Sequence, residues 1–234
     1  MSVAHRLTIG TLKALTRALC RIDDAQLERV PAHGPLILVT NHINIVEVPL
    51  LYTHLLPRPA ACLVASVRWE NPFYRWLLNG AQMIPLHRGE ADIAALREGL
   101  RRLAQGWIVI IAPEGTRSHT GRLQRGKAGV VPLALRSGAP LLPLVFFGHE
   151  GFGDNVRRLR RTYFHIAVGQ PFRLKPRGDG VTREVRQAMA DEIMRVLAAL
   201  LPPENRGVYA NFAEHPPRYV APLDAPRLPD QASA

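Results

Sequence analysis

Short apolar runs alternate with segments of helical periodicity over most of the chain, from residue 31 onward. Between residues 90 and 105, apolar side chains recur every three or four positions, and Gly106 is placed to end that helix. A second helix with one apolar stripe is predicted over residues 182–201, before Pro202 and Pro203. Strands are predicted in the apolar runs of residues 36–40, 61–66, 107–112, 141–147 and 163–168. Strands that alternate with helices indicate an α/β fold.

The first 21 residues predict an amphipathic, basic helix. At about 100° per residue, Arg6, Lys13, Arg17 and Arg21 fall within an arc of roughly 80°. Such a helix either lies in a lipid interface, with its cations on anionic headgroups, or packs on the domain with its cations in water. This segment alone favours neither alternative. The apolar positions on the other side of the helix are Val3, Leu7, Leu12, Leu15, Ala18 and Leu19.

The two ends of the chain set the expected domain boundaries. Residues 1–30 are predicted to form the basic helix and a linker, residues 31–201 one domain, and residues 202–234 a proline-rich tail without periodicity. We expect the domain to fold without residues 1–21. No apolar run reaches the roughly 18 residues of a membrane span, and cations interrupt any secretory signal at the N-terminus. The protein is therefore expected in the cytoplasm.

The net positive charge of the chain indicates an anionic partner. The chain carries 30 Lys and Arg against 19 Asp and Glu, a formal net charge of +11, and only three of its cations are lysines. Guanidinium groups suit phosphates and anionic lipid. Aromatic residues make up 6% of the chain and are not interleaved with the arginines, which disfavours nucleic acid as a partner. Cys20 and Cys62 are too few for a disulfide framework or a zinc site, so no metal role is expected.

The segment with the clearest chemistry follows the first predicted strand. His42 lies in a polar turn and Glu47 comes five residues later, roughly 140° away around a helix axis, so one of them must lie outside the helix. Asn44 and Glu47 fit a capping box, but Pro49 lacks the N–H that a helix capped at Asn44 requires. We therefore expect the helix to start at residues 46–48. Glu47 would then fix the tautomer of His42 and raise its basicity, the alternative being a structural histidine.

Two further polar segments are candidates for an anion site. Residues 113–118, PEGTRS, end a strand where open α/β sheets bind ligands, and the forked guanidinium of Arg117 suits a phosphate. Residues 121–128, GRLQRGKA, differ from a nucleotide-binding P-loop because Ala128 replaces the required Ser or Thr. Lys127 in this segment either reaches a phosphate or is solvated. The sequence also lacks the motifs of serine hydrolases, dinucleotide enzymes and zinc peptidases, so a basic histidine beside a phosphate site suggests attack by a bound hydroxyl.

Together these segments resemble the glycerolipid acyltransferases, the PlsC-like family of 1-acylglycerol-3-phosphate acyltransferases. Four blocks occur in the family's order: His42 with an acid five residues on, residues 84–88 (IPLHR), residues 113–118, and residues 139–144 (APLLPL). Residues 126–135, GKAGVVPLAL, also resemble the segment after the third block. One departure is that the family usually has aspartate where this chain has Glu47, whose side chain is longer by one methylene.

This resemblance implies an α/β fold in which a mixed sheet is flanked by helices, with an amphipathic N-terminal helix. His42, assisted by Glu47, would take a proton from a lysophospholipid hydroxyl, which attacks the thioester of acyl-CoA or acyl-carrier protein without a cofactor. The acceptor would be 1-acylglycerol-3-phosphate, taken from the cytoplasmic face of a membrane to which the enzyme binds peripherally. The alternatives are another lysolipid acceptor and a non-catalytic protein that binds anionic lipid. Acceptor and phosphate would contact Arg88, Glu114, Gly115 and Arg117, with Thr116 and Lys127 beside them.

Overall fold

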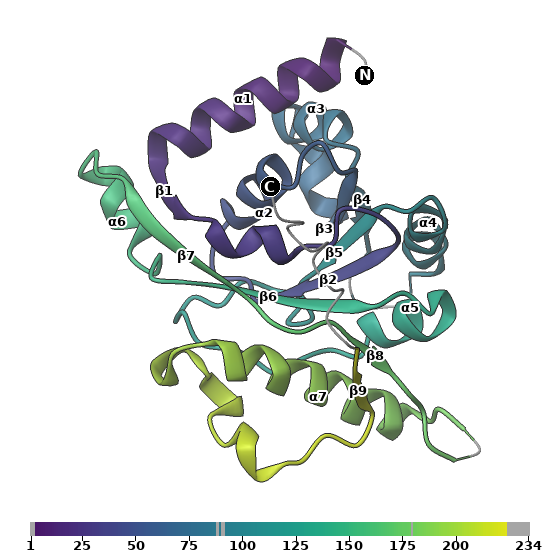
Figure 1. The fold of residues 1–234 in the computed structure, drawn as a ribbon. Coiled ribbons are helices and arrows are strands. Elements are labelled where there is room, and N and C mark those ends of the chain that lie inside the picture. The colour runs from purple at the N-terminus through teal and green to yellow at the C-terminus, as the bar shows by residue number, and fades with distance from the viewer. Residues whose placement is uncertain (1–2, 88, 90–91, 179, 224–234) are drawn as a thin grey trace, which may run out of the picture.

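The computed structural model describes residues 3–87, 89, 92–178 and 180–223, which form one mixed sheet with helices on both faces (Figure 1). The elements in chain order are α1 (Val3–Leu19), β1 (Cys20–Asp23), η1 (Ala25–Arg29), β2 (Leu36–Thr40), α2 (Glu47–His54), β3 (Ala60–Ala65), η2 (Ser66–Glu70), α3 (Pro72–Gly80), β4 (Ile84–Leu86), α4 (Ile93–Ala104), β5 (Ile108–Ile111), α5 (Val130–Ser137), β6 (Leu141–Phe147), α6 (Phe152–Arg157), β7 (Thr162–Val168), β8 (Phe172–Leu174), α7 (Arg183–Leu200), η3 (Pro203–Asn205), η4 (Gly207–Tyr209), η5 (Phe212–Glu214) and β9 (Val220–Pro222).

The strands of the sheet follow the order β1-β7-β6-β2-β5-β3-β4, and β8 pairs with β6 and β9. Strands β6, β2, β5, β3 and β4 are parallel to one another, whereas β7 and β8 run antiparallel to β6. The carboxyl ends of β2, β3, β5 and β6 therefore meet at one edge. In open α/β sheets this is the edge at which ligands bind.

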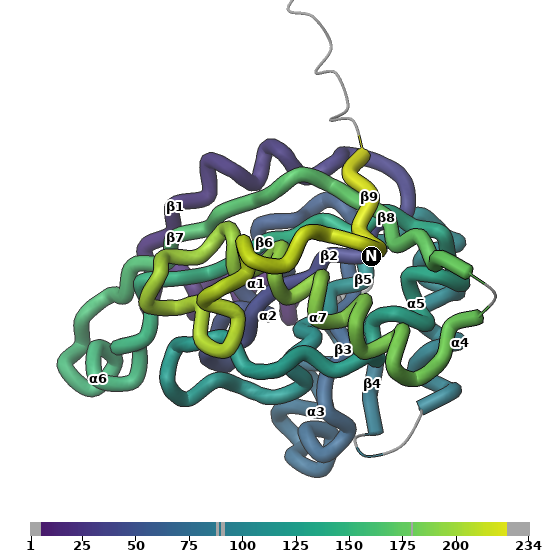
Figure 2. Tube along the Cα trace, turned by 90° about the horizontal axis from the view of Figure 1, so that it is seen from below, coloured from purple at the N-terminus to yellow at the C-terminus, as the bar shows by residue number. Residues whose placement is uncertain are grey.

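Both faces of the sheet are buried, as strand β2 illustrates. Its residues Ile37 and Val39 pack with α5 and α7, while Leu36 and Leu38 pack with α1 and α2. Figure 1 shows α1, α2 and α3 on one face of the sheet, and Figure 2, seen from below, shows α7 and the chain after it on the other face. Because each strand residue meets a helix on one face or the other, the central strands are continuous apolar runs rather than alternating ones.

The long elements confirm the sequence predictions to within a few residues. The five predicted strands correspond to β2, β3, β5, β6 and β7. The two predicted helices are α4, followed by Gly106 with φ of 79°, and α7, whose first turn is capped by the Thr182 hydroxyl accepting the Val185 N–H at 3.3 Å. The fold class predicted from the sequence, a mixed α/β sheet flanked by helices, is confirmed. Strands β1, β4, β8 and β9 have only three or four residues and were not predicted.

The N-terminal segment is a helix as predicted, but it belongs to the domain. Ile9 and Leu12 of α1 are buried in the core above the sheet. Residues 20–23, expected at the end of the helix and the start of the linker, instead form β1, which pairs in parallel with β7. Deleting residues 1–21 would remove buried side chains and part of an edge strand, so this packing does not support the expectation that the domain folds without them. In the part of the chain that the structure describes, no helix is long and apolar enough to span a membrane.

The segment after α7 also contains regular structure that the sequence did not predict. It returns along α7 through three short 3-10 helices and ends in β9, which extends the sheet beside β8. The carboxylate of Glu192 on α7 accepts the backbone N–H groups of Arg218, Tyr219 and Val220 at 2.7 to 3.0 Å. These bonds hold in place a segment for which the sequence predicts only a proline-rich tail without periodicity. Residues 224–234 of the predicted tail lie outside the described residues.

Candidate active site

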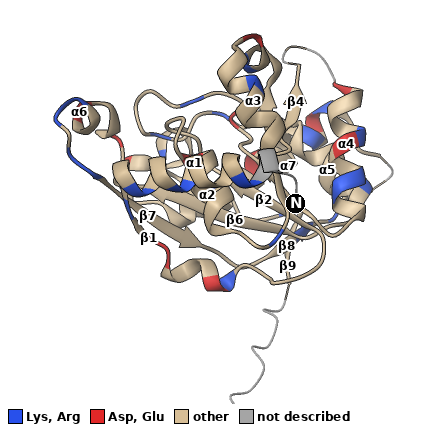
Figure 3. Ribbon diagram, turned by 90° about the horizontal axis from the view of Figure 1, so that it is seen from above, with Lys and Arg blue, Asp and Glu red and all other residues tan. Residues whose placement is uncertain are grey.

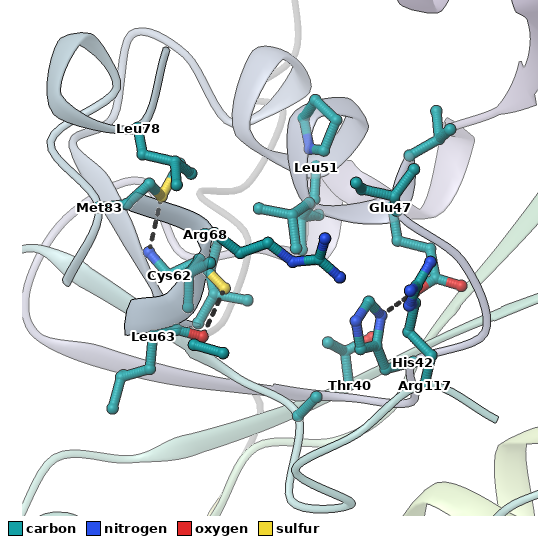
Figure 4. A pocket seen from close by; sticks show the side chains of 18 of the residues that line it. Thr40, His42, Glu47, Leu51, Cys62, Leu63, Arg68, Leu78, Met83 and Arg117 are labelled. Carbon is teal, nitrogen blue, oxygen red and sulfur yellow. Dashed lines mark hydrogen bonds and ion pairs between the residues drawn. The ribbon is translucent and has the colours of Figure 1, made fainter. Parts of the chain in front are cut away.

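The edge formed by the carboxyl ends of the parallel strands opens into a cavity of about 420 Å³. His42 follows β2, residues 115–117 follow β5, and Arg68 lies in η2 directly after β3. Figure 4 shows the His42 ring and the Arg68 side chain pointing into this space from opposite sides, with Arg117 beside His42. The cavity therefore brings together a titratable ring and two guanidinium groups.

His42 and Glu47 form the hydrogen-bonded pair that the sequence predicts. The Nδ1 atom of His42 lies 2.7 Å from Oε2 of Glu47, and the side chains are 22% and 2% exposed. Helix α2 begins at Glu47 and has Pro49 in its first turn, which confirms the predicted helix start. Because the carboxylate binds Nδ1, that nitrogen carries the proton, and Nε2 is left with a free lone pair.

Glu47 also organises the turn that carries His42. Its Oε1 accepts the backbone N–H groups of Ile43 at 2.8 Å and Asn44 at 3.0 Å, and the Asn44 side chain accepts the Val46 N–H at 2.9 Å. The bond from the Asn44 N–H is the one a capping box makes, although the helix starts three residues later. The capping contact and the contact with His42, treated as alternatives from the sequence, are therefore present together.

A second histidine, which sequence reasoning missed, binds the other oxygen of Glu47. His149 follows β6, is fully buried, and has Nε2 at 2.6 Å from Oε1 of Glu47. Burial acts to raise the pKa of Glu47, but the hydrogen bonds from His149 and His42 outweigh it and lower that pKa. A polar residue just past an apolar strand, at the same edge as His42, was the available sequence signal.

Glu114, predicted in the acceptor site, is instead buried behind it. Its two oxygens accept the backbone N–H groups of His42 and Gln124, each at 2.9 Å, and its side chain does not line the cavity. Burial raises the pKa of Glu114 to about 7, opposed by these two hydrogen bonds and reinforced by the nearby charge of Glu47. Ser118 donates its N–H to the His42 carbonyl at 2.7 Å. Glu114 thus ties the loops after β2 and β5 together.

Some of the other predicted acceptor residues line the cavity and some do not. Gly115, Thr116 and Arg117 line the cavity. Lys127 is exposed and passes beside Gly115 without lining the cavity, and a Cβ at Gly115 would lie 3.1 Å from its Cδ. Gly115 also has φ of +67°, so glycine suits this position for both reasons. Arg88 lies outside the described residues.

Two guanidinium groups, those of Arg117 and Arg68, line the cavity together with His42. Among the residues that the structure describes, no carboxylate forms an ion pair with Arg117 or Arg68, and both side chains are half-buried. Arg68 was not predicted, because a single arginine in a short polar segment carries no distinctive spacing. Unpaired guanidinium groups beside a histidine form a site suited to a phosphate.

The rest of the cavity wall is apolar and comes from three helices above the sheet. The side chains of α1, α2 and α3 that line it include Leu12, Leu15, Leu51, Phe73 and Leu77. No group of three or more potential metal ligands occurs among the described residues. The cavity thus combines a polar end, with a histidine and two arginines, and an apolar end that suits a hydrocarbon chain.

Comparison with known proteins agrees with this arrangement. A family model described as Acyltransferase matches residues 21–147. A 1-acyl-sn-glycerol-3-phosphate acyltransferase of Cocos nucifera is 31% identical over 141 residues, covering 58% of this chain and 46% of that protein. One of Borreliella burgdorferi is 27% identical over 127 residues, covering 53% and 50%. The chain thus spans about half the length of these two curated relatives.

The fold is also shared with a solved structure. The 1-acyl-sn-glycerophosphate (LPA) acyltransferase PlsC of Thermotoga maritima superposes with a TM-score of 0.57 at 21% identity, covering 84% of this chain and 76% of that one. The family model begins in β1 and ends with β6, so it includes His42, Glu47, Arg68 and Arg117. Since this match covers just over half of the chain, the chain belongs to the acyltransferase family, as its resemblance to PlsC-like proteins implied.

Proposed function

We propose that this protein transfers an acyl group from a thioester, either acyl-CoA or acyl-carrier protein, to the hydroxyl of a lysophospholipid. The observation that carries the proposal is one cavity with the His42–Glu47 pair and two guanidinium groups at its polar end, neither paired with a carboxylate among the described residues, and an apolar wall beyond. An amphiphile with a phosphate, a free hydroxyl and a hydrocarbon chain matches each part. The names of the relatives from Cocos nucifera and Borreliella burgdorferi favour 1-acylglycerol-3-phosphate as the acceptor, giving phosphatidic acid.

The proposed reaction uses the free Nε2 lone pair of His42 as a general base. Nε2 takes the proton of the acceptor hydroxyl as its oxygen attacks the thioester carbonyl, and Glu47 stabilises the imidazolium that forms. The tetrahedral intermediate then expels the thiolate, which takes the proton back from Nε2. The products are the acylated lipid and the free thiol, and His42 returns to its starting state. No cofactor enters this sequence of steps.

The assay that tests the proposal follows thiol release from acyl-CoA, and separately from acyl-carrier protein, with a panel of lysolipids. We expect release that depends on a lysolipid and is fastest with 1-acylglycerol-3-phosphate. Faster turnover of a lysolipid with a larger headgroup would assign a different acceptor. Binding of anionic lipid without thiol release from either donor would reject the enzyme proposal in favour of a lipid-binding protein.

Arg117→Lys is expected to weaken use of the acceptor more than use of the acyl donor. Lysine keeps the positive charge but loses the two-pronged contact with a phosphate, so KM for 1-acylglycerol-3-phosphate should rise about tenfold, with KM for acyl-CoA nearly unchanged. Steady-state kinetics with each substrate varied in turn measures both values. The matched control is Arg157→Lys, because Arg157 is an exposed arginine on α6 that does not line the cavity. Equal losses for both substrates would contradict the assignment of Arg117 to the acceptor phosphate.

We also propose that α1 and α3 hold the enzyme on the cytoplasmic face of a membrane. The two helices pack together, and Leu7 of α1 and Trp76 of α3 are 59% and 39% exposed outside the cavity wall. Figure 3 shows the Lys and Arg positions of α1 along one side of that helix. Apolar side chains beside cations are typical of a helix pair that binds anionic lipid at the interface.

The variant Leu7→Glu/Trp76→Glu is expected to bind vesicles containing anionic lipid at least about tenfold more weakly, because it adds charge where apolar area would be buried. Co-sedimentation measures the binding, and binding of the unaltered protein should also fall as salt is raised. Val208→Glu is the control, since this 70% exposed side chain lies on η4, which packs with α7 on the other face of the sheet. A double variant that sediments like the unaltered protein would place the membrane contact elsewhere.

A further inference from the structure

His149 is a buried imidazole that the proposed reaction does not use. Its ring stacks on Phe164 with centroids 4.4 Å apart and meets the edge of Phe146 at 6.2 Å. Nε2 lies 2.6 Å from Oε1 of Glu47, while Nδ1 has no hydrogen-bond partner within the described structure. A side chain selected for packing alone would not bring an unpartnered polar atom into this apolar environment. We therefore attribute the position of the ring to its contact with Glu47.

The protonation state of His149 follows from these contacts. Oε1 of Glu47 only accepts hydrogen bonds, so Nε2 carries the hydrogen and donates it. A second proton on Nδ1 would leave a buried N–H without an acceptor, which disfavours the charged ring. His149 therefore acts as a neutral donor, in contrast to His42, whose ring is partly exposed and gains a proton in the proposed reaction.

We infer that His149 is a positioning residue that holds the Glu47 carboxylate in the orientation in which Oε2 binds His42. Three donors converge on Oε1, from Ile43, Asn44 and His149, and they leave Oε2 to the His42 ring. This role in turnover rests on the proposed function, in which His42 is the base.

Among these donors, His149 alone connects the carboxylate to the sheet. The N–H groups of Ile43 and Asn44 belong to the same turn as His42, whereas His149 follows β6. The contact thus fixes the pair relative to a neighbouring strand. The glutamate side chain reaches both rings, with Oε2 at 2.7 Å from Nδ1 of His42 and Oε1 at 2.6 Å from Nε2 of His149. Glu47 and His149 therefore act as a matched pair.

Removing the donor should change the basicity of His42 as well as its position. In the unaltered protein the charge of Glu47 is shared among His149, His42 and two backbone N–H groups. Without His149, more of that charge is available to the imidazolium of His42, which raises the pKa of the ring. The other charged or titratable groups around His42 stay the same in every variant. They are Glu114 behind its backbone and Arg68, Arg117 and His119 along the cavity.

The test compares His149→Leu, which removes the donor, with His149→Gln, whose amide can still donate to Glu47. We expect His149→Leu to lower kcat by about 10- to 10²-fold with KM for both substrates changed less than about twofold. The acidic limb of the kcat/KM profile should move to higher pH, and His149→Gln should restore most of kcat and the original limb. His165→Leu is the matched control, because His165 also stacks on a phenylalanine, Phe147, but has no contact with Glu47.

A second measurement keeps this inference separate from the proposed function. Titration of the ¹⁵N-labelled His42 ring by NMR should show a raised pKa in His149→Leu, whether or not the protein transfers acyl groups. A folded His149→Leu variant with unchanged kcat and unchanged His42 pKa would overturn the inference. The inference would also be overturned if His149→Leu lost thermal stability and activity while the pKa of His42 stayed the same and His149→Gln did not restore activity. If the leucine variant does not fold, His149→Met removes the same donor with a more adaptable side chain.

Discussion

His42→Ala is expected to lower kcat for acyl transfer by about 10²- to 10⁴-fold, the range typical of losing a general base. The ring of His42 lines the cavity, and its Nε2 is the unprotonated nitrogen, since Nδ1 is held by Glu47. The contacts proposed for the acceptor phosphate, Arg68 and Arg117, are left in place. Binding of 1-acylglycerol-3-phosphate should therefore be largely kept while the chemical step is lost.

Single-turnover thiol release and equilibrium binding of the acceptor measure these two effects separately. His54→Ala is the control, because His54 ends the same helix, α2, but does not line the cavity. A folded His42→Ala variant that turns over at the rate of the unaltered protein would remove His42 from the mechanism. Loss of binding in proportion to loss of rate would instead assign His42 to substrate recognition.

The fold was predictable where a pattern extends over enough residues to be recognised. Strands β2 and β6 contain apolar runs of four and seven residues, and α4 and α7 show one apolar face over several turns. Strand β1, by contrast, has four residues with mixed exposure, and it becomes a strand because β7 lies beside it. Pairing between segments about 140 residues apart is a tertiary effect that local periodicity does not report.

The candidate site was predictable where local geometry determines the contact. Pro49 sets the start of α2, so the bond between His42 and Glu47 follows from the eight residues 42–49. His149 lies 102 residues from Glu47 and reaches it only because β6 is adjacent to β2 in the sheet. Glu114 illustrates the opposite case. The resemblance to the acyltransferase family places Glu114 in the acceptor site together with Arg117, but residues of one turn can point to opposite sides, and the carboxylate of Glu114 binds backbone N–H groups.

Glu47→Gln is expected to abolish turnover almost as completely as loss of His42, although it changes only one atom. The amide oxygen should occupy the Oε1 position, where the N–H groups of Ile43, Asn44 and His149 all require an acceptor. The amide NH₂ then faces Nδ1 of His42 and donates to it, so the ring must carry its proton on Nε2. With the proton on the nitrogen that faces the cavity, the neutral ring cannot act as a base. A wrong tautomer of this kind costs about 10⁴-fold in the Ser-His-Asp triad.

This prediction is distinguishable from simple loss of charge by its response to pH. If glutamine only removed the charge of Glu47, the pKa of His42 would fall, so the acidic limb would move to lower pH and part of the rate would remain above it, whereas a ring fixed in the wrong tautomer stays nearly inactive across the pH range. The kcat–pH profile and the ¹⁵N chemical shifts of the His42 ring measure the rate and the tautomer. Glu192→Gln makes the same change at a buried carboxylate on α7 and should keep kcat. A Glu47→Gln variant that keeps a substantial rate, with its acidic limb moved to lower pH and the proton of His42 on Nδ1, would show that Glu47 acts through its charge and not by selecting the tautomer.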